Sequence, residues 1–174
     1  MSLAIVNSLA QVGISAPRVT VEVHISRGLP SFSMVGLPET AVRESRDRVR
    51  GAIINSGFEF PNRRISVNLA PADLPKEGGR FDLPIALGVL AASRQLPQEQ
   101  IRDRIFLGEL ALDGSLRHVP GALIAALSAR ESCQLLCLPE CSAQQAKIVT
   151  EAKIATARSL LQLGRGLILS LIHI

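Results

Sequence analysis

The feature that most constrains the fold is an apolar segment in the middle of the chain, Leu83–Ala92. It is about ten residues long, whereas a helix that crosses a bilayer needs roughly 20. The segment is apolar on nearly all sides, so a helix formed by it must be buried on all sides. Asp82 precedes it and is expected to cap this helix, which we place at Leu83–Ser93. The sequence therefore predicts a domain built around one central helix.

Short segments rich in Val and Ile are typical of strands. In Arg18–Ser26 apolar and polar residues alternate, which predicts a half-buried strand with His24 on its solvent-facing side. Asp113-Gly114 is a strong hairpin signal. We therefore expect Arg104–Leu112 to pair with Ser115–His118. The remaining predicted strands are Leu3–Leu9, Ser31–Val35, Ile65–Leu69, Gln134–Leu138 and Lys153–Thr156.

Helical patterns alternate with the later strands. Pro38 suits the first turn of a helix and Gly57 suits its end. The other predicted helices are Gln98–Asp103, Gly121–Arg130, Ser142–Val149 and Arg158–Leu163. Strands that come first and then alternate with helices indicate an α/β or α+β fold with one mixed sheet.

The composition narrows the class of protein. Apolar residues make up 47% of the 174 residues, which suffices for a sizeable core and excludes an intrinsically disordered chain. Aromatic residues make up 3%, with neither Trp nor Tyr, which argues against a site that stacks bases on aromatic side chains. The first residues lack a basic signal region and the chain has three Cys, so we expect reduced thiols in a cytoplasm and no membrane span.

Arginine dominates the basic residues, and three of them recur at helical spacing in the predicted first helix: Arg43, Arg46 and Arg50. They share one face and, with Arg63 and Arg64, could contact the phosphates of a nucleic acid. Acidic residues are interleaved with them, so a solvated, salt-bridged face is the alternative. A subunit interface is the third interpretation. The net charge of +4 does not distinguish between phosphate contact, a solvated face and a subunit interface.

The loop Leu74–Asp82 is the second candidate site. Gly78 and Gly79 allow close approach of the backbone, and the amides that begin the following helix could hold an anion. Lys76 and Arg80 add positive charge, so the loop could contact DNA phosphate, a nucleotide-bound module or a neighbouring subunit. The alternative is a structural loop in which Arg80 pairs with Glu77 or Asp82.

Other chemistry-bearing residues form no recognisable site. Cys133, Cys137 and Cys141 have a spacing that matches none of the usual zinc or iron–sulfur motifs, so we interpret them as free thiols. His118 has no obvious acidic partner and is interpreted as non-catalytic. The phosphate-binding motif G-x-x-x-x-G-K-[ST] does not occur in the chain. We therefore predict no metal and no cofactor in this chain.

Three long motifs carry a resemblance to a known family. They are residues 35–46 (VGLPETAVRESR), 67–84 (VNLAPADLPKEGGRFDLP) and 106–117 (FLGELALDGSLR). In order and spacing they resemble the N-terminal domain of the magnesium-chelatase-like AAA+ ATPases of the ComM/YifB type. The resemblance covers residues 1–163 and implies a ribosomal S5 domain 2-like fold, similar to that of the Lon protease domain.

The resemblance also bears on catalysis. The serine motif of Lon, P-K-D-G-P-S-A-G, is matched by residues 75–82, where Arg80 stands at the position of the nucleophile. At the position of the Lon lysine stands Leu123. Neither side chain can replace its counterpart, because the hydroxyl needs a base beside it to act as a nucleophile. Proteolysis of the Lon type is therefore not expected, nor is small-molecule kinase activity.

The resemblance implies a function for the parent protein. In the family this domain precedes an AAA+ module that uses ATP and Mg²⁺, and the parent is a homo-hexameric DNA helicase that promotes branch migration during natural transformation. The expected role of residues 1–163 is that of a non-catalytic accessory domain. The alternative is a stand-alone oligomerisation or nucleic-acid-binding domain with no motor. Residues 164–174 lack a polar face and a cap, so we expect a non-native or truncated tail there, in which His173 has no functional role.

Overall fold

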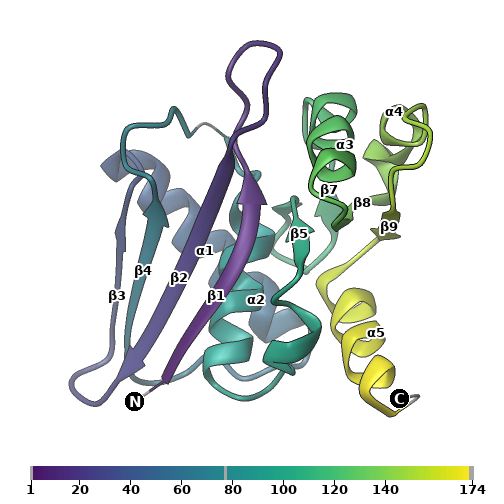
Figure 1. Cartoon of the computed structure of the whole chain (residues 1–174). Helices are drawn as coiled ribbons and strands as arrows, with labels where there is room; N and C mark the ends of the chain where they lie inside the picture. Colours follow the sequence, from purple (N-terminus) through teal and green to yellow (C-terminus); the bar gives the residue numbers. More distant parts are fainter. Residues whose placement is uncertain (1, 77, 173–174) are drawn as a thin grey trace.

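A computed structural model describes residues 2–76 and 78–172, and it confirms the mixed α/β class (Figure 1). One sheet has seven strands in the order β3-β4-β2-β1-β5-β8-β9. Their bounds are β1 Ser2–Leu9, β2 Arg18–Ser26, β3 Ser31–Val35, β4 Arg64–Ala70, β5 Arg104–Phe106, β8 Leu135–Pro139 and β9 Ile154–Ala157. Strand β2 is antiparallel to β1 and β4, and the other neighbouring pairs are parallel.

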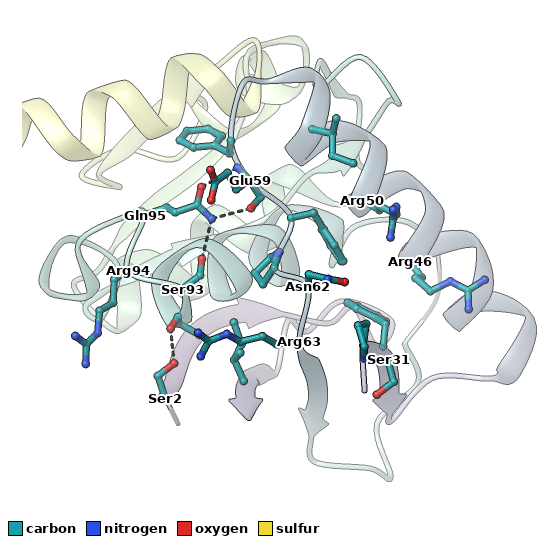
Figure 2. Close-up of a pocket in the computed structure, with 18 of the residues that line it drawn as sticks. Ser2, Ser31, Arg46, Arg50, Glu59, Asn62, Arg63, Ser93, Arg94 and Gln95 are labelled. Atoms are coloured by element: carbon teal, nitrogen blue, oxygen red, sulfur yellow. Dashed lines mark hydrogen bonds between the residues drawn. The ribbon is translucent and has the colours of Figure 1, made fainter. Parts of the chain in front are cut away.

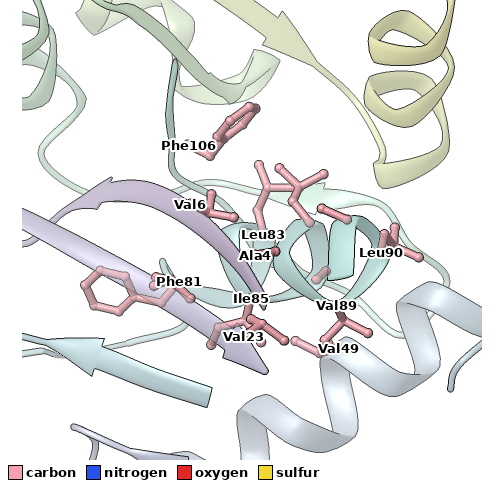
Figure 3. Packing of buried hydrophobic residues seen from close by; sticks show 14 of the residues in the cluster. Ala4, Val6, Val23, Val49, Phe81, Leu83, Ile85, Val89, Leu90 and Phe106 are labelled. Carbon is pink, nitrogen blue, oxygen red and sulfur yellow. The ribbon is translucent and has the colours of Figure 1, made fainter. Parts of the chain in front are cut away.

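Helix α2 (Asp82–Ala92) is the central helix that the apolar segment predicts, and all its residues are buried. It packs across β1 and β2, and Figure 3 shows Ile85 and Val89 near Val23 of β2. Gly88 lets the helix approach Val23. The neighbouring α1 (Glu39–Asn55) adds Val49 to the same core. Because α2 has no free face, the position of both its ends is fixed by the sheet and by α1.

The prediction that Asp82 caps α2 is wrong. Phe81 is the N-cap residue, and no side chain makes a capping hydrogen bond at this end. Asp82 belongs to the helix itself and is 1% exposed. Its carboxylate is used by other elements, as described below.

A second, smaller core lies on the other half of the sheet. Helices α3 (Ala122–Glu131) and α4 (Ala143–Ala146) cover β5 and β8 there, through buried alanines and leucines (Figure 1). Val19 and Val23 of β2 point toward the first core, and His24 is half-buried on the opposite face of the strand. The predicted alternation of this strand is therefore confirmed.

The predicted hairpin around Asp113-Gly114 is only partly correct. Residues 104–112 do not form one strand, because β5 pairs with β1 and β8 in the large sheet. Only the short strands β6 (Glu109–Leu110) and β7 (Leu116–Arg117) form the hairpin. The segment predicted as Gln98–Asp103 contains a 3-10 helix at Gln98–Gln100.

The last helices also differ from their predicted bounds. Instead of one helix over Ser142–Val149, a 3-10 helix at Glu140–Ser142 precedes the short α4. The prediction that the last helix ends at Leu163 is wrong, because α5 spans Leu160–Ile172. Leu167 in its second half is buried against the main core. His173 lies outside the described residues.

Within residues 2–76 and 78–172, no helix combines the length and hydropathy needed to cross a membrane.

Candidate functional site

A groove of about 1130 Å³ lies at the C-terminal end of α2. Helix α1 forms one wall and the segment after α2 forms the other, with the loop before β4 between them (Figure 2). In Figure 2, Arg46 and Arg50 come from α1, Ser93 and Gln95 come from the far wall, and Asn62 lies between. We call this feature the arginine groove.

Positive charge exceeds negative charge in the arginine groove. Its basic lining residues are Arg46, Arg50, Arg63 and Arg94, and its acidic ones are Asp47 and Glu59. Arg46 donates to the Asp47 carboxylate at 3.3 Å, which neutralises part of its charge. Arg94 has a φ of 62°, in the left-handed region that favours glycine. The other three basic lining residues, Arg50, Arg63 and Arg94, make no ion pair among the described residues.

Aromatic side chains gather in the same groove. Three of the five Phe residues of the chain line it: Phe32, Phe58 and Phe60. The rings of Phe32 and Phe60 lie 6.3 Å apart, and the guanidinium of Arg50 lies 5.3 Å from the centre of the Phe60 ring. Low aromatic content argues against a site that stacks bases on aromatic side chains. Composition alone, however, cannot show that three of the five Phe residues lie together in one groove.

Hydrogen bonds fix the wall that carries these rings. The side chain of Gln95 accepts from the backbone N–H of Glu59 at 2.8 Å and donates to its carbonyl at 2.7 Å. The same amide nitrogen donates to the hydroxyl of Ser93 at 2.9 Å, as Figure 2 shows. The loop 58–60 is thereby tied to the end of α2 before any ligand is bound.

The predicted arginine face of α1 is divided in two by the structure. Arg46 and Arg50 line the groove, whereas Arg43 pairs with Glu39 at 3.1 Å in solvent. Arg63 lines the groove and Arg64 does not. The salt-bridged alternative therefore describes Arg43 and also Arg46, which pairs with Asp47.

Sequence reasoning missed Arg48, which lies on the other side of α1. Its Nε donates to the buried carboxylate of Asp82 at 2.7 Å, and its Nη2 donates to the same group at 3.2 Å. The hydroxyl of Ser45 also donates to the Asp82 carboxylate, at 2.7 Å. The backbone N–H of Leu110 donates to the same carboxylate at 3.2 Å. Burial raises the pKa of Asp82 above its ordinary value, while the bonds from Arg48 and Ser45 act in the opposite direction. This network ties α1, α2 and β6 together and leaves Asp82 no free acceptor position for a ligand.

The loop Leu74–Asp82 lies at the N-terminal end of α2, opposite the arginine groove. The amides that were expected to hold an anion are occupied: Leu83 donates to the carbonyl of Gly108 at 3.0 Å, and Ile85 donates to that of Phe81 at 3.0 Å. Pro84 has no amide proton. The expectation that these amides bind an anion is therefore not supported by the geometry.

The basic residues of this loop are buried. Lys76 and Arg80 are each 6% exposed, and Lys76 donates to the carbonyl of Leu74 at 3.3 Å. Arg80 reaches the carbonyl of Pro120 at 3.5 Å, and its Nε and Nη2 have no acceptor among the described residues. Burial lowers the pKa of Arg80. The expected pairing of Arg80 with Asp82 is absent from this part of the chain, and Glu77 lies outside the described residues.

The glycines of the loop have different surroundings. Gly78 has a φ of 70° and open space where a Cβ would stand. At Gly79 a Cβ would lie 2.5 Å from the side chain of Glu109. The loop therefore packs against β6 at Gly79 and is open at Gly78.

The other chemistry-bearing residues stay apart. His118 Nδ1 lies 3.1 Å from the hydroxyl of Ser142, which also accepts the N–H of Val119 and is buried. Burial raises the pKa of Cys137 to about 12, whereas Cys133 and Cys141 are exposed. In the part of the chain that the structure describes, no group of three or more His, Cys, Asp or Glu residues could hold a metal ion.

The fold and the groove together define a mixed α/β domain with an open basic surface at one end of its central helix. Comparison with known sequences identifies the family: residues 21–142 match the family described as subunit ChlI of Mg-chelatase, and the chain belongs to it.

Named relatives agree with the resemblance. The chain is 61% identical to "Uncharacterized protein YifB" of Escherichia coli over 76% of this chain and 26% of that protein. It is 53% identical to "Competence protein ComM" of Haemophilus influenzae over 92% of this chain and 32% of that protein. An uncharacterised Mycobacterium tuberculosis protein is 39% identical over 94% of this chain. The chain thus spans about a quarter to a third of the length of these relatives.

Proposed function

We propose that this chain is the non-proteolytic accessory domain of a magnesium-chelatase-like AAA+ ATPase that acts on DNA, and that its arginine groove contacts DNA phosphates. The observation that carries this proposal is the groove itself, which is lined by three arginines, Arg50, Arg63 and Arg94, that make no ion pair within the described part of the chain. Planar guanidinium groups suit phosphate oxygens, because each can donate two parallel hydrogen bonds. A relative whose name is competence protein is consistent with work on DNA.

The ATPase activity is proposed for a longer parent protein and not for this chain. The chain has no G-x-x-x-x-G-K-[ST] motif, so it supplies no loop of this type for the phosphates of ATP. ATP, Mg²⁺, the homo-hexameric ring, helicase activity, branch migration and a cytoplasmic location are therefore proposed for a parent protein. Within such a parent, this domain would hold or guide DNA while the ATPase module moves it.

Peptidase chemistry has no support in the two positions compared with Lon. Arg80 is a buried cation, and Leu123 is an apolar side chain on the outer side of α3. Neither can deliver or accept the proton that a serine nucleophile must lose. We expect no casein hydrolysis by this chain.

The test is a DNA-binding titration by fluorescence anisotropy at several salt concentrations. We expect binding that weakens steeply with salt, because phosphate contacts release counterions. The variant Arg63→Gln/Arg94→Gln removes two groove cations that make no ion pair among the described residues, and it should lower the slope of log K against log salt by about 1.4–1.8. The control, Arg43→Gln, removes an arginine that lies outside the groove. Absence of binding at low salt, or an equal effect of the control, contradicts the proposal.

One observation favours the alternative of an oligomerisation domain. Ile14 at the tip of the β1–β2 hairpin is 94% exposed, and Leu123 and Leu127 are exposed on α3. The hairpin and α3 are in contact, because the hydroxyl of Ser128 donates to the carbonyl of Ala16 at 3.1 Å. Sedimentation velocity over a range of concentrations tests this alternative. Assembly that Ile14→Ser/Leu127→Ser abolishes, together with no DNA binding, would favour it.

A further inference from the structure

The arginine groove differs from surfaces that bind duplex DNA. Sequence-reading proteins insert a projecting helix or ribbon into a groove of the duplex. Here the basic side chains line a concavity whose volume of about 1130 Å³ is close to that of a large small-molecule pocket. A few nucleotides of one strand fit such a space, whereas a duplex can only lie across its rim.

The pairing of Arg50 with Phe60 adds a feature that phosphate binding does not require. The ring of Phe60 is half-buried and packs against the main core, so its position is fixed. Arg50 lies over this ring at 5.3 Å, and Phe32 supports the ring at 6.3 Å. Both residues line the groove, and the cation–π contact restrains the guanidinium there; unpaired bases stack on guanidinium planes.

The surrounding groups suit a single strand as well. The side chain of Arg46 lies one helical turn from Arg50, and Arg63 lies on the loop between the walls (Figure 2). Asn62 is exposed in the same loop and carries both a donor and an acceptor for a base edge. Phosphate contacts and base contacts are therefore available within one concavity.

From these observations, and resting on the proposed function, we propose that the arginine groove receives an unpaired strand of nucleic acid, with a base stacked on the Arg50–Phe60 pair. This pair distinguishes unpaired from paired bases, because a base within a duplex cannot expose its face. The flanking arginines then contribute charge, and the pair contributes the preference for a single strand.

The experiment compares two probes on the 174-residue chain: a labelled single-stranded 12-mer and a hairpin duplex of the same sequence. The key variant is Arg50→Lys, which keeps the charge and loses the planar group. We expect it to weaken single-strand binding by about tenfold, from the measured worth of base stacking. Duplex binding should change by less than about twofold, since phosphate attraction is retained. Arg43→Lys serves as the matched control and should change neither.

A second readout reports stacking directly. A 12-mer that contains 2-aminopurine should lose fluorescence on binding the unchanged chain and retain it with Arg50→Lys. Phe60→Leu should act in the same direction, provided its circular dichroism spectrum matches that of the unchanged chain.

The outcomes separate the two proposals. If neither probe binds, the proposed function fails and this inference fails with it. If the duplex binds as tightly as the single strand and Arg50→Lys leaves the fluorescence quenching intact, the inference fails while DNA binding by the domain stands.

Discussion

Arg48→Met tests whether the buried carboxylate of Asp82 depends on its ion pair. The substitution removes the two hydrogen bonds from Arg48 and leaves only those from Ser45 and Leu110. Removing one partner of a buried pair costs about 3–5 kcal/mol. The side chain of Arg48 is 23% exposed, so water can partly replace it, and we expect about 3 kcal/mol. For a domain of this size that lowers Tm by about 6–12 °C.

The pH dependence of this loss is the sharper test. Burial already raises the pKa of Asp82, and removal of Arg48 takes away an influence that lowers it. A carboxyl group whose pKa is raised on folding stabilises the fold at low pH and loses that contribution as pH rises through the folded pKa. The variant should therefore lie closest to the unchanged chain at pH 4.5 and furthest from it at pH 7.5.

Urea denaturation followed by circular dichroism at both pH values measures the difference in free energy of unfolding. Arg43→Met, which breaks the exposed pair with Glu39, is the control and should cost no more than about 0.5 kcal/mol. The double variant Arg48→Met/Asp82→Asn should recover much of the loss, because no unpaired charge remains. A cost for Arg48→Met below about 1 kcal/mol at pH 7.5, or one that is equal at both pH values, would refute the reasoning.

Three further predictions concern packing, charge and thiol reactivity. Gly88→Ala places a Cβ 2.4 Å from the side chain of Val23 and should lower the free energy of unfolding in urea by about 1–3 kcal/mol. Gly166→Ala on α5 meets open space and should raise it by about 0.5–1 kcal/mol, so equal effects of the two would contradict the packing of α2. Arg80→Met removes a buried guanidinium with two nitrogens that lack acceptors in the described chain, and it should raise the urea midpoint, which Arg80→Lys should not do. A lower midpoint for the Met variant would count against this. Burial raises the pKa of Cys137 to about 12, so a thiol reagent at pH 8 should label two cysteines in the folded chain and the third only in urea. Mass spectrometry counts the labels, and three equal labelling rates would show that this thiol is accessible.

Local patterns were sufficient for the elements whose burial follows one period. The alternation in β2 and the apolar surface of α2 each predict the element and its place, because both elements pack in the main core. The strand β5 could not be separated from the hairpin in this way. Its partners, β1 and β8, lie far away in the sequence, and only pairing in space ends the strand at Phe106.

The sequence predicted the basic residues that α1 contributes to the groove, because their spacing along the helix is a local pattern. It did not predict the aromatic residues of the groove, because their contacts depend on segments that meet only in the folded chain. Helical spacing singled out Arg46 and Arg50, but it also included Arg43, which α1 directs into solvent. The clustering of Phe32 and Phe60 has no local signal, because β3 and the loop before β4 meet only in the fold.

The two ends of α2 explain why the candidate site lies where it does. At the N-terminal end, Asp82 accepts bonds from α1 and β6, and the first amides of the helix have acceptors, so the chemistry there is internal. At the C-terminal end, the side chain of Gln95 bonds the backbone of Glu59, and three of the four arginines that line the groove make no ion pair among the described residues. A helix of eleven residues separates these ends by about 16 Å. Rigid anchoring at one end therefore allows the other to present a preformed groove with an excess of positive charge, which is the property that the proposed strand binding requires.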